Sequence, residues 1–418
     1  MGPIALFDKS FIQSLSIDES IWFDHFFYPI ICPLFYVETL ADLTKATNSK
    51  GRTAEDLVRI IADKTPVLSG GPCIHHQELC ISNLMGHSVP LNGQIPRAGG
   101  RYVQTPDGKS GHVFDESPEA KAFTRWQNGD FLEVERKYAE SWRKMLTTLD
   151  LSATATRMRE LGINSQECKS VEAAYEIATQ LVRSRTKPFE QMALLFAFLD
   201  IPSNLHHSIL ERWSIDQYRP LFDYAPYAAH VLVVELFFQI ALGANLISSE
   251  RASNRIDISY LCYLPFSMIF ISSDKLHRKC ARVFLRKNQE FIWGPDLKAE
   301  LSRQNSEFSK LPAESLELGL MKFAPAPIGD ASHLLIQLWD RHTPNWRSQE
   351  KKESIQLSPE AEKKIVEDMI QLAKSNSVAM PEDDNYEELD QMVIQRLVPK
   401  RKGSWWLLPK SLKVEDDS

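Results

Sequence analysis

Cysteine is scarce in this sequence, with six residues among 418. The six are scattered, at Cys32, Cys73, Cys80, Cys168, Cys262 and Cys280. So few cysteines at irregular spacing do not form the disulfide framework that small secreted proteins use. We therefore expect no structural disulfide and a reducing, cytoplasmic environment.

An excess of positive charge is also missing. The chain has 48 lysine and arginine residues against 55 aspartate and glutamate residues, which gives a formal net charge of -7. Proteins that coat nucleic acid through their overall charge need the opposite balance, because they neutralise phosphates. The composition excludes that class and still permits a local basic groove.

The usual motifs of targeting and nucleotide binding are absent from the sequence. Residues 1–8 contain no basic segment and no long apolar run, so they do not resemble a signal peptide. No Gly-x-x-x-x-Gly-Lys-Ser/Thr loop and no strand-turn-helix Gly-x-Gly-x-x-Gly motif occurs. The longest apolar stretch, Ala225 to Ile247, contains His230, Glu235 and Gln239 near its middle. These polar residues favour a buried core helix over a membrane span, so we expect no membrane contact.

What is present is a globular composition, 43% hydrophobic and 25% charged, with enough residues for two or three domains. A short apolar run, Ile4 to Phe7, predicts a strand, and Pro33 to Leu43 predicts a helix with proline in its first turn. Glycine, proline and histidine are frequent from 49 to 119, which predicts long loops and sparse regular structure. Residues 119–246 follow a mostly helical pattern.

A second apolar region begins at Ile256. Its last part, 267–271, predicts a buried strand that leads into Ser272-Ser273-Asp274, and a helix is expected over 275–287. The pattern weakens beyond Leu301. It returns at 358–374, where Ser358 as cap and Pro359 at the first position predict an amphipathic helix.

Two of the predicted strands end at an aspartate, Asp8 after the first and Asp274 after the second. If these strands are parallel neighbours, both carboxylates reach the edge of the sheet where ligands bind. Like charges at close range need a cation between them. Asp257 opens a predicted helix over 258–264, and Glu38 lies inside the helix that begins at Pro33, so both acids are able to approach the same edge.

The order of these residues resembles the PIN domain family of nucleases. It runs from Asp8-Lys9-Ser10 through Glu38 and Asp257 to Ser272-Ser273-Asp274. The resemblance covers about the first 47 residues and 254–301, roughly a quarter of the chain. It implies an α/β/α sandwich with a parallel sheet and an acidic cluster that holds Mg²⁺ or Mn²⁺. It also implies cleavage of single-stranded RNA or, in flap-type relatives, of DNA.

This chain departs from the family in the separation of its second and third acids, between which about 200 residues intervene. We therefore expect a split PIN-like nuclease domain, residues 1–47 plus 250–301. A large insertion, 48–249, is expected to be loop-rich and then mainly α-helical. The C-terminal region, 302–418, is expected to be partly helical with a flexible tail.

The residue types define the expected chemistry, because carboxylate oxygens suit Mg²⁺ or Mn²⁺ and such ions activate water against a phosphate. We assign Asp8 and Asp274 as direct metal ligands, and Glu38 and Asp257 as ligands or water-holding groups. Ser10 and Ser272 would support them through hydrogen bonds. The expected substrate-binding stripe consists of Arg278, Arg282 and Arg286, which recur every fourth residue after Asp274.

Several alternatives remain open at the level of sequence. The acids are also ordinary candidates for strand ends and helix caps. The chain would then be a catalytically silent scaffold that binds a protein partner through the insertion, and a toxin or defence effector would share the nuclease site. Metal-ligating residues also cluster in the loop-rich segment, where zinc is a further possibility: Cys73, His75, His76, Cys80 and His87. Trp405 and Trp406 follow a basic run, either to contact bases or to pack on the domain itself.

Overall fold

The computed structural model describes residues 2–46, 51–68, 70–97, 100–184, 186–350, 358–379 and 391–412. Its centre is a sheet of five parallel strands in the order β3-β2-β1-β6-β7. The strands are β1 (Ile4–Phe7), β2 (Tyr28–Ile31), β3 (Gly71–Pro72), β6 (Ile269–Ser272) and β7 (Glu290–Trp293). The expected α/β class with a parallel sheet is confirmed, and so is the strand before Asp8.

Both faces of this sheet are buried, which explains the nearly continuous apolar runs of its strands. Along β1, Leu6 packs into one hydrophobic core while Ala5 and Phe7 pack into another. The same alternation occurs in β6, where Phe270 faces the first core and Ile271 the second. Alternate side chains of a strand point to opposite faces, so each strand contributes to both cores.

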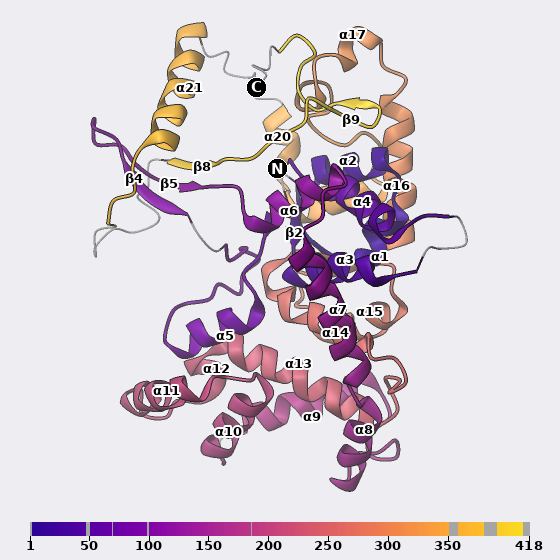
Figure 1. Ribbon diagram of the computed structural model, residues 1–418, viewed down its shortest axis with the longest axis vertical. Helices are drawn as coiled ribbons and strands as arrows, with labels where there is room; N and C mark the ends of the chain where they lie inside the picture. The colour runs from indigo at the N-terminus through magenta and orange to yellow at the C-terminus, as the bar shows by residue number, and fades with distance from the viewer. Residues whose placement is uncertain are drawn as a thin grey trace.

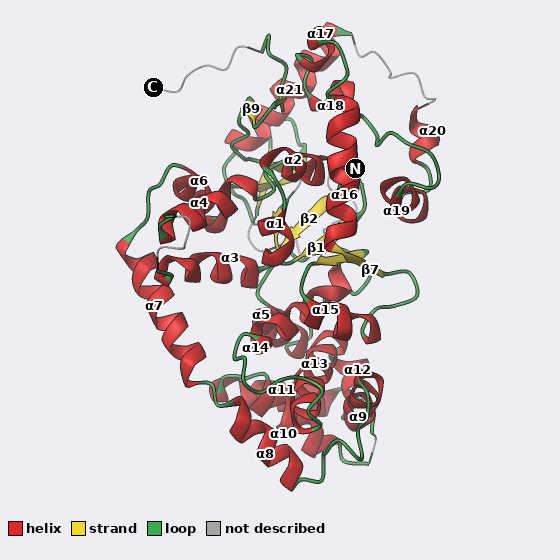
Figure 2. Cartoon of the chain, turned by 90° about the vertical axis from the view of Figure 1, so that its right-hand side faces the viewer, coloured by secondary structure: helices red, strands yellow, loops and turns green. Residues whose placement is uncertain are grey.

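Helices cover the two faces of the sheet. One face carries α1 (Lys9–Ser14), α2 (Ile17–Phe26), α4 (Ala54–Lys64) and α16 (Gly294–Phe308). The other is covered by α5 (His76–Leu84), α13 (Pro226–Gly243), α14 (Asn254–Ser259) and the 3-10 segment Tyr260–Phe266. Figure 2 shows β1 and β2 between these two groups of helices. The arrangement is compatible with an α/β/α sandwich.

The strand order reverses beside β1. The chain moves outward from β1 through β2 to β3, and it returns to the other side of β1 as β6 and then β7. Ala5 pairs with Ile269 and Phe7 with Ile271 across the junction of β1 and β6. In open α/β sheets the crevice at such a switch point, outside the carboxyl ends of the strands, is where ligands bind. Asp8 and Ser273 lie immediately past these two strand ends.

A block of helices lies between β5 and β6 in sequence, as expected for residues 119–246. It comprises α6 (Pro118–Gln127), α7 (Glu133–Thr148), α8 (Leu151–Glu160), α9 (Val171–Arg183), α10 (Pro188–Phe198), α11 (Ser203–Ile215), α12 (Leu221–Tyr224) and α13. The central helix α13 is long and apolar enough to cross a membrane, but 83% of its apolar window is buried inside the protein. It contacts α5, α8, α9 and α12, which form the lower part of Figure 1.

The segment 49–119 contains more regular structure than expected, so the prediction of long loops is wrong for much of it. Thr53 and Asp56 form a capping box that starts α4, and α4 packs on α1 and α2. The segment also supplies β3, α5, β4 (Arg101–Gln104) and β5 (Ser110–Phe114). One strand of the central sheet, β3, and two of the helices that cover its faces, α4 and α5, therefore come from residues assigned to the insertion.

The C-terminal region is partly helical. Its helices are α17 (Ala313–Leu316), α18 (Leu320–Phe323), α19 (Leu334–His342), α20 (Trp346–Glu350) and α21 (Pro359–Lys374). The last one begins as expected, with Ser358 accepting a hydrogen bond from Ala361 N. It packs on a small sheet of β4, β5 and β8 (Gln391–Ile394), at the upper left of Figure 1. The end of the expected tail, 413–418, lies outside the described residues.

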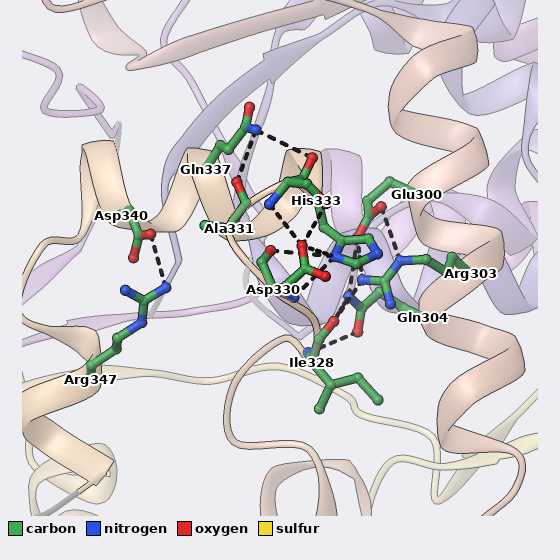
Figure 3. Close-up of polar contacts among 11 residues, drawn as sticks. Glu300, Arg303, Gln304, Ile328, Asp330, Ala331, His333, Gln337, Asp340 and Arg347 are labelled. Atoms are coloured by element: carbon green, nitrogen blue, oxygen red, sulfur yellow. Dashed lines mark hydrogen bonds and ion pairs between the residues drawn. The ribbon is translucent and has the colours of Figure 1, made fainter.

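Two contacts fasten this region to the sheet domain. Arg303 Nη2 and Gln304 Nε2 on α16 both donate to the carbonyl of Ile328, and Figure 3 shows how this loop lies against the helix. The hairpin of β9 (Arg401–Lys402) and β10 (Trp405–Trp406) places Trp405 against Trp22, with ring centroids 4.8 Å apart. Trp405 is buried, so it packs on the domain and is not exposed to bases.

Candidate active site

Asp8 is the most fully bonded acid of the predicted set. It caps α1, with Oδ1 accepting from Phe11 N at 3.0 Å. Its Oδ2 accepts from Ser10 Oγ and Ser272 Oγ, both at 2.7 Å, and from His277 Nδ1 at 3.2 Å. A carboxylate offers about four lone-pair sites, so these four bonds use most of its capacity. Ser10 and Ser272 therefore hold the Asp8 carboxylate in place.

His277, on α15 (Lys275–Cys280), is the residue of this site that the sequence interpretation missed. Its Nδ1 faces the Asp8 carboxylate, and its Nε2 lies 2.6 Å from the backbone carbonyl oxygen of Asp257. Nδ1 also lies 2.8 Å from Ser272 Oγ, whose proton is donated to Asp8. The Asp8 carboxylate and the Asp257 carbonyl both accept hydrogen bonds, so both ring nitrogens donate and the ring is an imidazolium. Burial lowers the pKa of His277, but Asp8 and Asp257 together outweigh burial and raise the pKa to about 9. The same contact holds the pKa of Asp8 below its usual value, although burial opposes this.

Glu38 reaches the site from α3 (Pro33–Leu40). Its Oε2 accepts a 2.5 Å hydrogen bond from the hydroxyl of Tyr260, which is fully buried. Burial raises the pKa of Glu38, although the bond from Tyr260 and the charge of Lys9 lower it. Lys9 Nζ donates to the backbone carbonyl of Glu38 at 2.8 Å and forms a 2.6 Å ion pair with Asp42. Lys9 and Tyr260 thus fix the helix and the carboxyl group of Glu38.

Asp257 lies in the first turn of α14. Burial raises its pKa to about 7; the charge of His277 lowers it, while the nearby acids Glu38, Asp274 and Asp8 raise it. The mutual influence of these carboxyl groups follows from their gathering at one edge of the sheet. Asp257 and Glu38 therefore hold their protons more tightly than ordinary acids do.

Asp274 caps α15, and its Oδ1 accepts from Leu276 N at 2.6 Å. Ser272 connects it to Asp8, because Ser272 Oγ accepts from Asp274 N and donates to Asp8 Oδ2. Asp8 and Asp274 thus both have the cap role that was the alternative interpretation of these residues. A cap role leaves Asp274 Oδ2 available for a further contact, because only Oδ1 bonds the helix.

The predicted arginine stripe does not form one helical face. The helix expected over 275–287 ends at Cys280 and continues only as a 3-10 turn, Ala281–Val283, because Phe284 turns inward against Phe237. Arg286 consequently bonds the carbonyl of Pro265 instead of joining the stripe. Arg278 stays exposed, with its guanidinium 4.8 Å from the ring centre of Trp293 at the end of β7. Arg282 is also exposed.

The donor chemistry suits a hard divalent cation, but the side chains are not gathered around one point. Within the described ranges, no group of three or more histidine, cysteine, aspartate or glutamate residues is arranged to hold a metal ion. The same holds for the zinc candidates: Cys73, His75, His76, Cys80 and His87, all of which are described. A cation at the acidic edge therefore requires the carboxyl groups of Glu38 and Asp257 to turn toward it.

Comparison with known proteins adds no assignment: no protein family, no curated protein and no solved structure matches this chain. The site must therefore be interpreted from its own geometry. The site is an acidic site at the switch point of a parallel α/β sheet. It consists of four carboxyl groups and one imidazolium.

Proposed function

We propose that the chain is a metal-dependent endonuclease, a phosphodiester hydrolase with a PIN-like acidic site for Mg²⁺ or Mn²⁺. Single-stranded RNA is the preferred substrate, as the resemblance to PIN domains implies, with DNA second. The observation that carries the proposal is the raised pKa of Glu38 and of Asp257 at the switch point beside β1. Buried acids that repel one another at a ligand-binding crevice are the arrangement that a cation would neutralise.

Each residue has a specific task in this proposal. Glu38 and Asp257 release their protons and supply oxygen ligands, and Asp274 offers Oδ2. Asp8, held by Ser10 and Ser272, keeps a fixed orientation at the centre. When bound, Mg²⁺ or Mn²⁺ orients a water molecule and neutralises charge on the attacked phosphate. The imidazolium of His277 balances part of the acidic charge while no substrate is bound.

The surroundings of the site support a nucleic-acid substrate. Arg278 and Trp293 lie together at the carboxyl end of β7, next to the acidic edge, where an arginine contacts phosphate and an aromatic ring stacks on a base. Replacing Arg278 and Arg282 with glutamate should weaken RNA binding and reduce its salt dependence. Unchanged binding would remove both arginines from the proposed substrate surface.

The decisive experiment is cleavage of labelled single-stranded RNA and DNA by the purified chain with Mn²⁺, Mg²⁺ or EDTA. Glu38→Gln and Asp257→Asn should abolish cleavage without removing a helix cap, unlike substitutions of Asp8 and Asp274. The matched control is Asp223→Asn, because Asp223 is an exposed acid on α12. Metal-dependent cleavage that survives Asp257→Asn would refute the site, and cleavage by no form of the protein would refute the function.

The competing proposal is a catalytically silent scaffold that binds a protein partner through the helical block. The bonds that nearly saturate Asp8 favour it, because a carboxylate so occupied has little left for a metal. Calorimetric titration with Mn²⁺ separates the two proposals. A nuclease of this type should bind Mn²⁺ with an affinity that Asp257→Asn removes, whereas the scaffold should not bind it. A toxin or defence effector would share the nuclease result and differ in its target.

A further inference from the structure

A cavity of about 190 Å³ lies apart from the acidic site, in the half of the molecule formed by α5, α10, α11 and α13 (Figure 1). Its walls include His76 and Cys80 from α5, Phe198 from the end of α10, Val231 and Glu235 from α13, and Arg255 from α14. Asp8, Glu38, Asp257 and Asp274 are not among the lining residues. The cavity has room for about six water molecules, which is the scale of a compact ligand.

Arg255 is one of the residues that line this cavity. Its Nη1 donates to Oε1 of Glu235 at 2.8 Å and forms an ion pair with Oε2 at 2.7 Å. Among the described residues, none accepts from Nε or Nη2, so the two-nitrogen edge of the guanidinium stays available. Phe238 lies under the group, 5.6 Å from its central carbon. The arginine is thus held in place while its bidentate edge has no protein partner.

His76 supplies a second donor. Its backbone N–H donates to the hydroxyl of Tyr263 at 3.0 Å, and the same hydroxyl lies 3.1 Å from the ring Nδ1. Burial lowers the pKa of His76 to about 3, so the ring is neutral. In the tautomer that carries the ring proton on Nε2, Nδ1 accepts from the Tyr263 hydroxyl. With this tautomer, Arg255 and His76 together offer three donor nitrogens, and Phe198 and Val231 are apolar lining residues.

The charges select among ligands. Glu235 already neutralises Arg255, and Asp200, at the exposed part of the wall, is acidic. An anion would add an unbalanced negative charge, whereas a neutral ligand with adjacent acceptor atoms satisfies the donors at no such cost. We propose that this cavity binds a neutral, planar heterocycle of nucleobase size, with its acceptor edge on Arg255. Guanine is the best match, because its O6 and N7 atoms accept the bidentate edge of an arginine.

The test is calorimetric titration of the full-length chain with guanosine, adenosine, cytidine and succinate, without metal ions so that nuclease activity plays no part. Guanosine should bind most tightly. Arg255→Lys keeps the charge but loses the two-nitrogen edge, and it should weaken guanosine binding by about tenfold or more. Arg219→Lys is the control, because Arg219 is an exposed arginine in an i,i+3 ion pair.

A second variant keeps the proposal falsifiable if Arg255→Lys fails to fold. Val231→Phe fills the cavity from α13 and should abolish guanosine binding while leaving the Glu235–Arg255 pair in place. The proposal is overturned if no nucleoside binds the wild-type chain, if succinate binds more tightly than guanosine, or if Val231→Phe binds guanosine unchanged. The proposed nuclease site is unaffected by any of these results.

Discussion

Nδ1 of His277 donates to Oδ2 of Asp8 across 3.2 Å, a contact between residues 269 positions apart in sequence. The pair joins α15 to the end of β1 and places a positive charge among four carboxyl groups. Both side chains are buried. Breaking such a pair leaves one buried charge without a partner, which costs about 3–5 kcal/mol. This contact is therefore central to the stability of the acidic edge.

His277→Gln tests that contribution through its pH dependence. The pKa of His277 is raised from 6.5 to about 9, so the stabilisation is fully present below pH 6.5 and is lost as the pH rises through 9. We expect the variant to lose about 3 kcal/mol of unfolding free energy at pH 6 and much less at pH 9.5. Urea denaturation across this pH range measures the difference. A loss that does not change with pH would contradict the imidazolium.

Asp257→Asn should stabilise the protein and abolish the proposed function. The folded state binds the Asp257 proton more tightly than the unfolded state, with a pKa of about 7 against 3.8, so the carboxylate destabilises the fold increasingly between these values. Asparagine removes this cost. We expect a gain of about 1–2 kcal/mol at pH 8, measured by urea denaturation, and no gain at pH 4. The control Asp223→Asn should change neither the stability nor the proposed activity. Equal stability of Asp257→Asn and the wild type at pH 8 would contradict the raised pKa of Asp257.

Tyr260→Phe should shift the pH dependence of metal binding. The hydroxyl of Tyr260 lowers the pKa of Glu38, so its removal raises that pKa further. A carboxyl group that holds its proton more tightly binds a cation only at higher pH. The midpoint of Mn²⁺ binding against pH should therefore move upward, as calorimetry at several pH values would show. Tyr36→Phe, at a tyrosine that stacks on Trp126, provides the control and should leave the midpoint in place.

Lys9 and Asp42 should behave as a coupled buried pair. Their side chains are 12% and 6% exposed, and Lys9 also holds the backbone of Glu38. Lys9→Met should cost about 3 kcal/mol, because Lys45 is then the one ion-pair partner of Asp42 among the described residues. Lys9→Met/Asp42→Asn should cost less than the sum of the single changes. A double-mutant cycle in urea measures this coupling. Additive losses would mean that the ion pair does not contribute to stability.

The local signals of the sequence were sufficient for part of the site. The apolar run before Asp8 predicted β1. Because β1 and β6 are parallel neighbours, their carboxyl ends bring Asp8 and Ser272 together, as the sequence predicted for two such strands. Capping chemistry likewise located α21, because Ser358 and Pro359 act within a few residues of each other. These features depend on interactions between residues close together in sequence, so the local sequence pattern is enough to predict them.

Tertiary contacts decided what the sequence left hidden. His277 lies three residues after Asp274 in a basic segment, and only the fold turns it toward Asp8. The i,i+3 spacing was a usable signal, since both residues share one side of the helix. The strand β3 has two residues, and its pairing of Ile30 with Gly71 has no local pattern. The end of α15 at Cys280 was also missed, because a tertiary contact determines it. The burial of Phe284 ends the helix, although the periodic pattern of the sequence continues to residue 287.

The position of β1 beside β6 has a consequence for synthesis on the ribosome. Asp8 emerges early, but its partner Ser272 follows 264 residues later. At about 5–20 residues per second, roughly 13–50 s pass before the two can meet. Until then β1 has only β2 and β3 beside it, and no truncated chain that ends before β6 possesses the acidic edge. The order of the strands thus delays the assembly of the acidic edge until β6 has been made.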